Sequence, residues 1–149
     1  MVKIGKRSLE YTEERLNALM LEYDRYIASC PYIRMSEVFD HIVNQPCHRF
    51  WVSDRRAAVV VARMSKGASL KNMRPSKREM FQEIFRRVCQ LRKINPSLSL
   101  FQLVAEVIYQ PAPKFYLSAI SAKIMVYKAK KKWYAEKRQR MQKRRMSPC

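Results

Sequence analysis

The chain has 149 residues, about the size of one compact domain, and 31 basic against 12 acidic residues give it a formal net charge of +19. Hydrophobic residues make up 48% of the sequence, which is enough for a core and excludes a wholly disordered polycation. Only two glycines are present, Gly5 and Gly67, and this excludes a glycine-rich phosphate loop. No apolar run reaches the roughly 18 residues of a membrane span, and no apolar stretch marks a signal peptide. We therefore expect a soluble, cytoplasmic protein, associated with the nucleoid if the host is bacterial.

The sequence resembles itself after a shift of 65 positions. Residues 14–66 align without a gap on residues 79–131, with nine identities in 53 positions. The densest match joins residues 45–61 to residues 110–126, which share the pattern Q-P-x-x-[RK]-F-[WY]-[VL]-S-x-x-x-A. Recurrence at a fixed spacing indicates two copies of one supersecondary unit, and we expect an internal duplication.

Each copy begins with two helices. Apolar residues at three- and four-residue spacing predict a first helix, capped by Thr12 in the first copy and by a capping box at Ser76 in the second. Pro31 and Pro96 end these helices, because proline cannot continue a helix. A short second helix follows in each copy and ends at another proline.

The third helix of each copy is expected after Ser53 or Ser118, because serine is a favoured N-cap residue. The β-branched run at residues 59–61 also suits a strand, but the helical stripe continues more naturally through it. A connector precedes each serine, at residues 46–52 and 111–117, and its aromatic residues are too apolar to lie in solvent. We expect both connectors to pack across the helices.

The predicted fold class is all-α, with two tandem three-helix units and a basic C-terminal helical extension. The first unit spans residues 1–64, and a basic linker follows at residues 65–76. The second unit spans residues 77–130. A basic tail occupies residues 131–149 and is either helical, because strong helix formers dominate it, or disordered, because its like charges repel.

Positive charge is concentrated in two parts of the chain. Residues 49–93 carry thirteen basic against three acidic groups, net +10, and residues 128–149 carry ten against one, net +9. Such a density lowers stability through self-repulsion, so we expect an acidic partner, of which nucleic acid is the commonest. The tail lacks an apolar face, and we expect no membrane binding.

Three helices, of which the last carries cations, resemble the helix-turn-helix class of DNA-binding proteins in both copies. A small residue near the start of the third helix, Ala57 or Ala122, would let this helix approach the second one closely. The connectors are about twice as long as the usual turn of three or four residues, so the resemblance is to the class and to no specific family. It implies that the third helices contact DNA.

The candidate nucleic-acid contacts are the cations and serines of the third helices and the cations beside them. Arginines of the first copy can read guanine edges, whereas lysines of the second copy suit phosphates. In the tail, Trp133 and Tyr134 could stack on bases or instead cover the end of the core. The candidates are Arg49, Ser53, Arg55, Arg56, Arg63, Lys66, Lys114, Ser118, Ser121, Lys123, Lys128, Lys130, Lys131, Lys132, Lys137, Arg138 and Arg140.

The sequence therefore predicts a nucleic-acid-binding protein that prefers DNA to RNA, as a transcriptional regulator or a mobile-element accessory factor. The alternatives are an RNA-binding subunit of a larger enzyme and an adaptor for an acidic protein. No residues are organised as a catalytic site, so we expect no enzyme activity and no cofactor. Because the spacing of Cys30, His41, Cys47 and His48 matches no common zinc site, we expect no metal and only free thiols.

Overall fold

The computed structural model describes residues 3–146, and this part of the chain contains helices and no named strand. The all-α fold class is confirmed. The tail is helical as far as Met146, while residues 147–149 of the predicted tail lie outside the described range. The helices are α1 (Lys3–Ser29), α2 (Met35–Val43), α3 (Asp54–Ser65), α4 (Pro75–Ile94), α5 (Leu100–Ile108) and α6 (Ala119–Met146).

Two of the predicted helix starts are confirmed. The Ser53 hydroxyl accepts a hydrogen bond from the backbone N–H of Arg56 at 3.2 Å and caps α3. The Ser118 hydroxyl accepts one from the backbone N–H of Ser121 at 3.1 Å, directly before α6. These bonds satisfy a donor that the first turn of a helix leaves unpaired.

The other two predicted starts are wrong. Helix α1 begins at Lys3, so Thr12 lies inside the helix and is not its cap. Helix α4 begins at Pro75, and Ser76 lies in its first turn. Proline is favoured at the first helical position, because its fixed φ suits the helix and its missing N–H needs no partner there.

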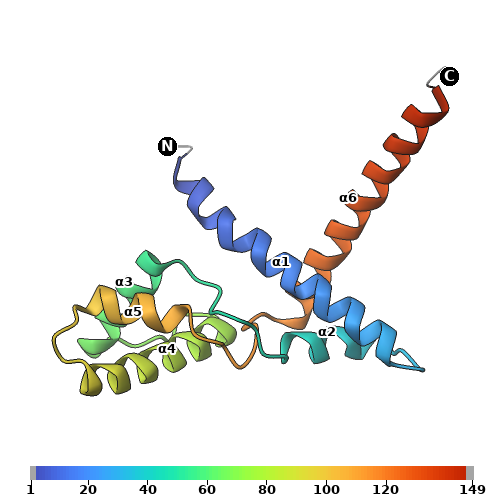
Figure 1. Ribbon diagram of the computed structural model, residues 1–149. Coiled ribbons are helices and arrows are strands. Elements are labelled where there is room, and N and C mark those ends of the chain that lie inside the picture. Colours follow the sequence, from blue (N-terminus) through green and yellow to red (C-terminus); the bar gives the residue numbers. More distant parts are fainter. Residues whose placement is uncertain (1–2, 147–149) are drawn as a thin grey trace.

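The six helices pack in two groups that are not consecutive in the chain. Helix α3 packs on α4 and α5, whereas α6 packs on α1 and α2. In the described part of the chain, no contact joins α2 to α3 or α5 to α6. Figure 1 shows the α3, α4 and α5 group on one side of the molecule and α2 on the other, with α1 running across.

This grouping corrects the expectation of two units built from consecutive helices, at residues 1–64 and 77–130. Each third helix leaves its own copy and joins the first two helices of the other one. Ala57 and Ala122 are fully buried and do allow a close approach, but it is to α4 and α5 for Ala57, and to α1 and α2 for Ala122. The helix-turn-helix pair of consecutive helices is therefore not formed.

The connectors carry the chain from one group to the other, and they meet in the middle. Cys47 and Ala112 exchange two backbone hydrogen bonds, of 3.0 and 2.8 Å. On one side of this bridge the N–H of Phe50 donates to the carbonyl of Ile108, and on the other side the N–H of Phe115 donates to the carbonyl of Val43, both at 2.9 Å. Phe115 lies 65 positions after Phe50, and Ile108 lies 65 positions after Val43, so the two bonds correspond to each other in the two copies.

Aromatic side chains of the connectors fill the two hydrophobic clusters. Phe50 stacks on Tyr116 at 5.9 Å between ring centroids, in the cluster formed with α3, α4 and α5. Trp51 stacks on Phe115 at 6.3 Å, in the cluster formed with α1, α2 and α6. Burial of these rings confirms that the connectors pack across the helices, and it ties both groups to one central crossing.

Candidate nucleic-acid interface

One cationic surface lies on α3. The core side of this helix is Ala57, Val60 and Val61, all buried. Its outward side carries Arg55, Arg56, Arg63 and Lys66, which are all exposed. None of these four cations forms an ion pair with a described acidic residue. We call these four residues the α3 face.

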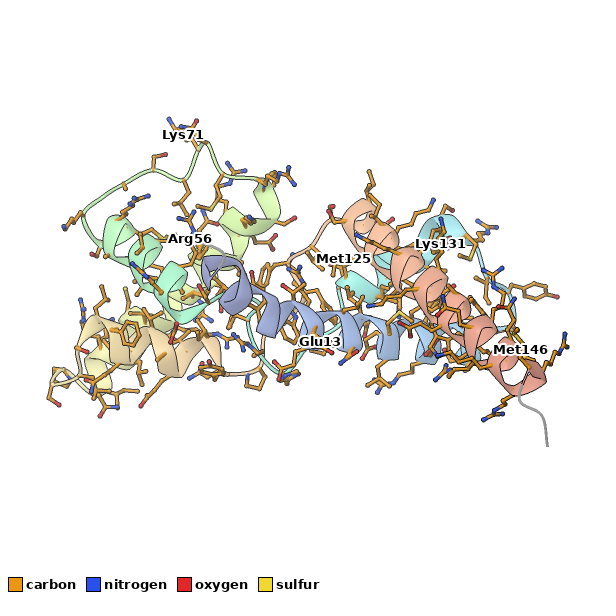
Figure 2. All side chains as sticks on the ribbon, turned by 90° about the horizontal axis from the view of Figure 1, so that it is seen from above. Glu13, Arg56, Lys71, Met125, Lys131 and Met146 are labelled. Carbon is orange, nitrogen blue, oxygen red and sulfur yellow. The ribbon has the colours of Figure 1, made fainter. Side chains whose placement is uncertain are left out.

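The linker after α3 adds to this surface. Gly67, at φ +88°, takes the left-handed conformation that ends many helices. Its N–H donates to the carbonyl of Met64 at 2.9 Å, and the N–H of Ala68 donates to the carbonyl of Arg63 at 3.0 Å. This turn directs the chain away from α3, and Lys71 lies at the apex of the linker (Figure 2). The linker thereby places further exposed cations beside the α3 face.

A second cationic surface is the end of α6, residues 128–146, which we call the α6 extension. It projects from the body of the molecule (Figure 1). From Lys131 to Met146 every residue is exposed except Ala135, which is half-buried. Its cations are Lys128, Lys130, Lys131, Lys132, Lys137, Arg138, Arg140, Lys143, Arg144 and Arg145.

Only one of these ten cations has an acidic partner among the described residues. The ammonium of Lys130 lies 3.7 Å from the carboxylate of Asp24 and 4.7 Å from the ring of Tyr23. Lys130 therefore joins α6 to α1. The other nine cations form no ion pair with a described acid.

The aromatic pair of the α6 extension does not cover the core. Trp133 and Tyr134 are 49% and 53% exposed, and their rings meet edge to face at 4.9 Å. The ammonium of Lys137 lies 5.0 Å from the Trp133 ring. The interpretation that these rings cover the end of the core is wrong, since they belong to a turn of α6 beyond its buried residues.

Arg49 has a different role from the one expected. Arg49 is 9% exposed, and its guanidinium donates hydrogen bonds to the carbonyls of Phe50 at 3.0 Å and Val52 at 2.9 Å. The carboxylate of Glu14 lies 3.8 Å away. These partners occupy the guanidinium, so Arg49 stabilises the first connector and is not an exposed phosphate contact.

Lys114, 65 positions after Arg49, has the matching role in the second connector. Its ammonium pairs with the carboxylate of Glu79, which is itself 65 positions after Glu14. The recurring glutamates are therefore explained by these two ion pairs.

The serine caps already satisfy donors that a phosphate would otherwise use. At α3, the N–H of Arg56 donates to Ser53, and the N–H of Arg55 donates to the carboxylate of Asp54 at 2.7 Å. At α6, Ser118 accepts from the N–H of Ser121, and their hydroxyls are also bonded, at 2.9 Å. The side chains of the α3 face are thus better placed for phosphate than the helix starts.

Most of the candidates lie in two areas, one on α3 and one on α6, while Arg56 and Ser121 line one cavity between these areas. The arginines of α3 lie in one helix group, whereas Lys123 and Lys128 are exposed on α6 in the other. The ammonium of Lys123 lies 5.8 Å from the ring of Tyr127. The two helices diverge because each joins the first two helices of the other copy.

Two other arginines in the positive region share one acidic partner. Glu83 of α4 accepts hydrogen bonds from Arg86 at 2.7 and 2.8 Å and from Arg87 at 3.1 Å. The hydrogen bonds from Arg86 hold the pKa of Glu83 below its ordinary value, with a smaller contribution from Arg87. This part of α4 therefore contributes less to a phosphate-binding surface than the sequence count suggests.

No helix in the described range is long and apolar enough to cross a membrane. Between residues 3 and 146, no three His, Cys, Asp or Glu side chains gather as a metal site would require. Comparison of the chain with protein-family models, curated proteins and solved structures finds no match.

Proposed function

We propose that the protein binds nucleic acid, with duplex DNA preferred, and that the α6 extension is its principal contact. The observation that carries this proposal is a helix that leaves the body of the molecule with nine cations that pair with no described acid. Such a helix repels itself, because its like charges lie three and four residues apart. Phosphates would neutralise it, and release of their counterions would favour binding.

The dimensions of the α6 extension suit a DNA groove. At a rise of 1.5 Å per residue, residues 128–146 span about 28 Å, close to one turn of B-DNA at roughly 34 Å. The major groove is about 12 Å wide and admits an α-helix. Cations lie all round this helix, so it can contact the phosphates of both groove walls.

The α3 face is the second contact in this proposal. Arg55 and Arg56 present guanidinium groups in its first turn, and Arg63 and Lys66 follow on the same side. Arginine forks can read guanine edges bidentately. We assign sequence preference to the α3 face and sequence-independent affinity to the α6 extension.

We also propose that the chain is an internal duplication folded as an intertwined pseudo-dimer. The reciprocal bonds of Cys47 and Ala112, the bonds of Phe50 and Phe115, and the two glutamate ion pairs all recur at a shift of 65 positions. Duplicated halves would approach one DNA from two helix groups, as the halves of a dimer do.

RNA is the second candidate, and the exposure of Trp133 and Tyr134 favours it. Unpaired bases can stack on such rings, and RNA offers them in loops and bulges. A regularly stacked duplex does not. The choice between DNA and RNA is therefore decided by whether paired or unpaired nucleic acid binds more tightly.

A competition experiment with the full chain tests the proposal. Labelled duplex DNA is displaced in moderate salt by unlabelled duplex, single-stranded DNA or folded RNA. We expect duplex DNA to compete best. Better competition by folded RNA would show that the protein prefers RNA to DNA. If neither binds, the adaptor for an acidic protein replaces it.

A matched pair of variants locates the contact. Lys137→Gln with Arg138→Gln removes two cations of the α6 extension, and we expect the affinity for duplex DNA to fall about tenfold or more at low salt. Lys93→Gln with Arg92→Gln removes an exposed Lys–Arg pair at the end of α4 and should change the affinity little. Equal losses from both pairs would contradict a principal contact at α6.

A further inference from the structure

A cavity of about 500 Å³ lies where the two helix groups meet. Helices α1, α3, α4 and α6 and both connectors line it. Arg56 and Met125, labelled in Figure 2, line it from α3 and from α6. Its volume is in the range of small-molecule sites, which is roughly 300–1,000 Å³.

Three cationic side chains from three different helices line this cavity, and no acidic side chain does. They are Arg15 of α1, Arg56 of α3 and Lys77 of α4. None of the three forms an ion pair with a described acid. Like charges held around one space repel each other unless an anion lies between them.

Arg15 is the most buried of the three. Its Nε is inaccessible to solvent and has no hydrogen-bond partner among the described residues, while its guanidinium lies 5.6 Å from the ring of Tyr11. Burial holds the pKa of Arg15 below its ordinary value, because loss of solvent disfavours the charged form. Arg15 is half-buried, and a partly buried cation without a counter-charge is costly, a cost that an anion in the cavity would reduce.

The fold does not need cations at these positions. At a shift of 65 residues, Arg15 corresponds to Met80, Arg56 to Ser121, and Lys77 to Thr12. Met80 is buried in the cluster of α3, α4 and α5, so an uncharged residue serves the packing at the matching place. The repeated fold therefore does not by itself explain why these three positions carry cations.

We propose that this cavity is a binding site for an anion of the phosphate class, held by Arg15, Arg56 and Lys77. Guanidinium groups bind phosphate oxygens bidentately, and an ammonium adds a point charge. The phosphate could be that of a free small molecule or a phosphodiester of a bound nucleic acid. The site is separate from the α6 extension and does not depend on nucleic-acid binding there.

The test uses the fluorescence of Trp51, which lines the cavity. The chain has two tryptophans, so Trp133→Phe in the full-length protein leaves Trp51 as the only reporter. Inorganic phosphate is titrated at constant ionic strength against potassium chloride. We expect a saturable change with phosphate and none with chloride. A response that is absent, or equal for both salts, would overturn the proposal.

Three substitutions in this background locate the anion. Arg15→Gln and Lys77→Gln should each weaken phosphate binding about tenfold, the size of one lost charge-assisted hydrogen bond. Lys71→Gln removes an exposed linker cation that does not line the cavity and should leave binding unchanged. Because Lys77 is exposed, its substitution leaves the fold intact even if Arg15→Gln does not. Equal weakening by Lys71→Gln and Lys77→Gln would exclude a site in the cavity.

The source of the phosphate is separated by adding a DNA duplex at saturating concentration. If a phosphodiester occupies the cavity, the duplex will raise the phosphate concentration needed for half-saturation. If the natural ligand is a free phosphorylated molecule, phosphate binding will be unchanged by the duplex. Failure of nucleic-acid binding at α6 leaves the titration with phosphate unaffected, so the two proposals fail separately.

Discussion

At the scale of single residues, the same type of side chain stabilises the fold at one position and is exposed to solvent at another. Arg49 and Arg55 are six positions apart, yet one is buried on backbone carbonyls and the other is exposed. A sequence count of positive charge treats them alike. The recurrence of Glu14 and Arg49 as Glu79 and Lys114 was the signal for their pairing, because both members of each pair repeat at the same shift.

Arg49→Met should lower the free energy of unfolding by about 2–4 kcal/mol, because it removes two charge-assisted hydrogen bonds to buried carbonyls. Arg55→Met, at an exposed position, should change it by less than about 0.5 kcal/mol. Urea denaturation of both variants measures the difference. If Arg49→Met changed the free energy of unfolding as little as Arg55→Met, Arg49 would not be a structural residue.

At the scale of elements, the spacing of apolar residues predicted the helices well. The apolar residues Val38, Phe39, Ile42 and Val43 of α2, at the three- and four-residue spacing of a helix, are all buried. Helix α1 begins nine residues before its predicted cap, Thr12, because its first turns carry no apolar stripe in the sequence. Arg15 was not predicted as a site residue, since it lies in residues 1–48, where seven acidic residues outnumber six basic ones, and no sequence motif marks it.

We expect α3 and α6, the third helices of the two copies, to contribute differently to nucleic-acid binding. Arg55→Ala with Arg56→Ala should reduce the preference for a specific duplex over a random one, because these arginines are the ones able to read bases. Lys123→Ala with Lys128→Ala should weaken all sequences alike, because lysines mainly contact phosphates. Binding to a selected and a scrambled duplex measures both effects. Equal, sequence-independent losses of affinity from both pairs would contradict this difference between α3 and α6.

At the scale of the whole molecule, the grouping of helices could not be predicted from the sequence. An apolar stripe states which face of a helix is buried but not which helix covers it. Ala57 and Ala122 indicated a close approach, and the long connectors did not specify the partner. The crossing is fixed by the backbone bonds between the connectors, which sequence patterns do not encode.

Hydrogen exchange tests this crossing with two matched variants. Val61 of α3 and Val126 of α6 are both fully buried and lie 65 positions apart. Val126→Ala, at a cost of about 2 kcal/mol, should raise amide exchange in α1 and α2, whereas Val61→Ala should raise it in α4 and α5. Faster exchange within the consecutive helices of the mutated copy would contradict the observed grouping.

The proposed binding of duplex DNA requires phosphate contacts by the exposed cations of the α6 extension, and the salt dependence of duplex binding tests this most directly. With about 6–10 phosphates engaged, the affinity of the full chain for duplex DNA should fall by about 10³–10⁵ between 50 and 200 mM salt. Lys137→Gln with Arg138→Gln should reduce the slope of log affinity against log salt concentration by about 2. An affinity that does not change with salt would contradict phosphate binding by the α6 extension.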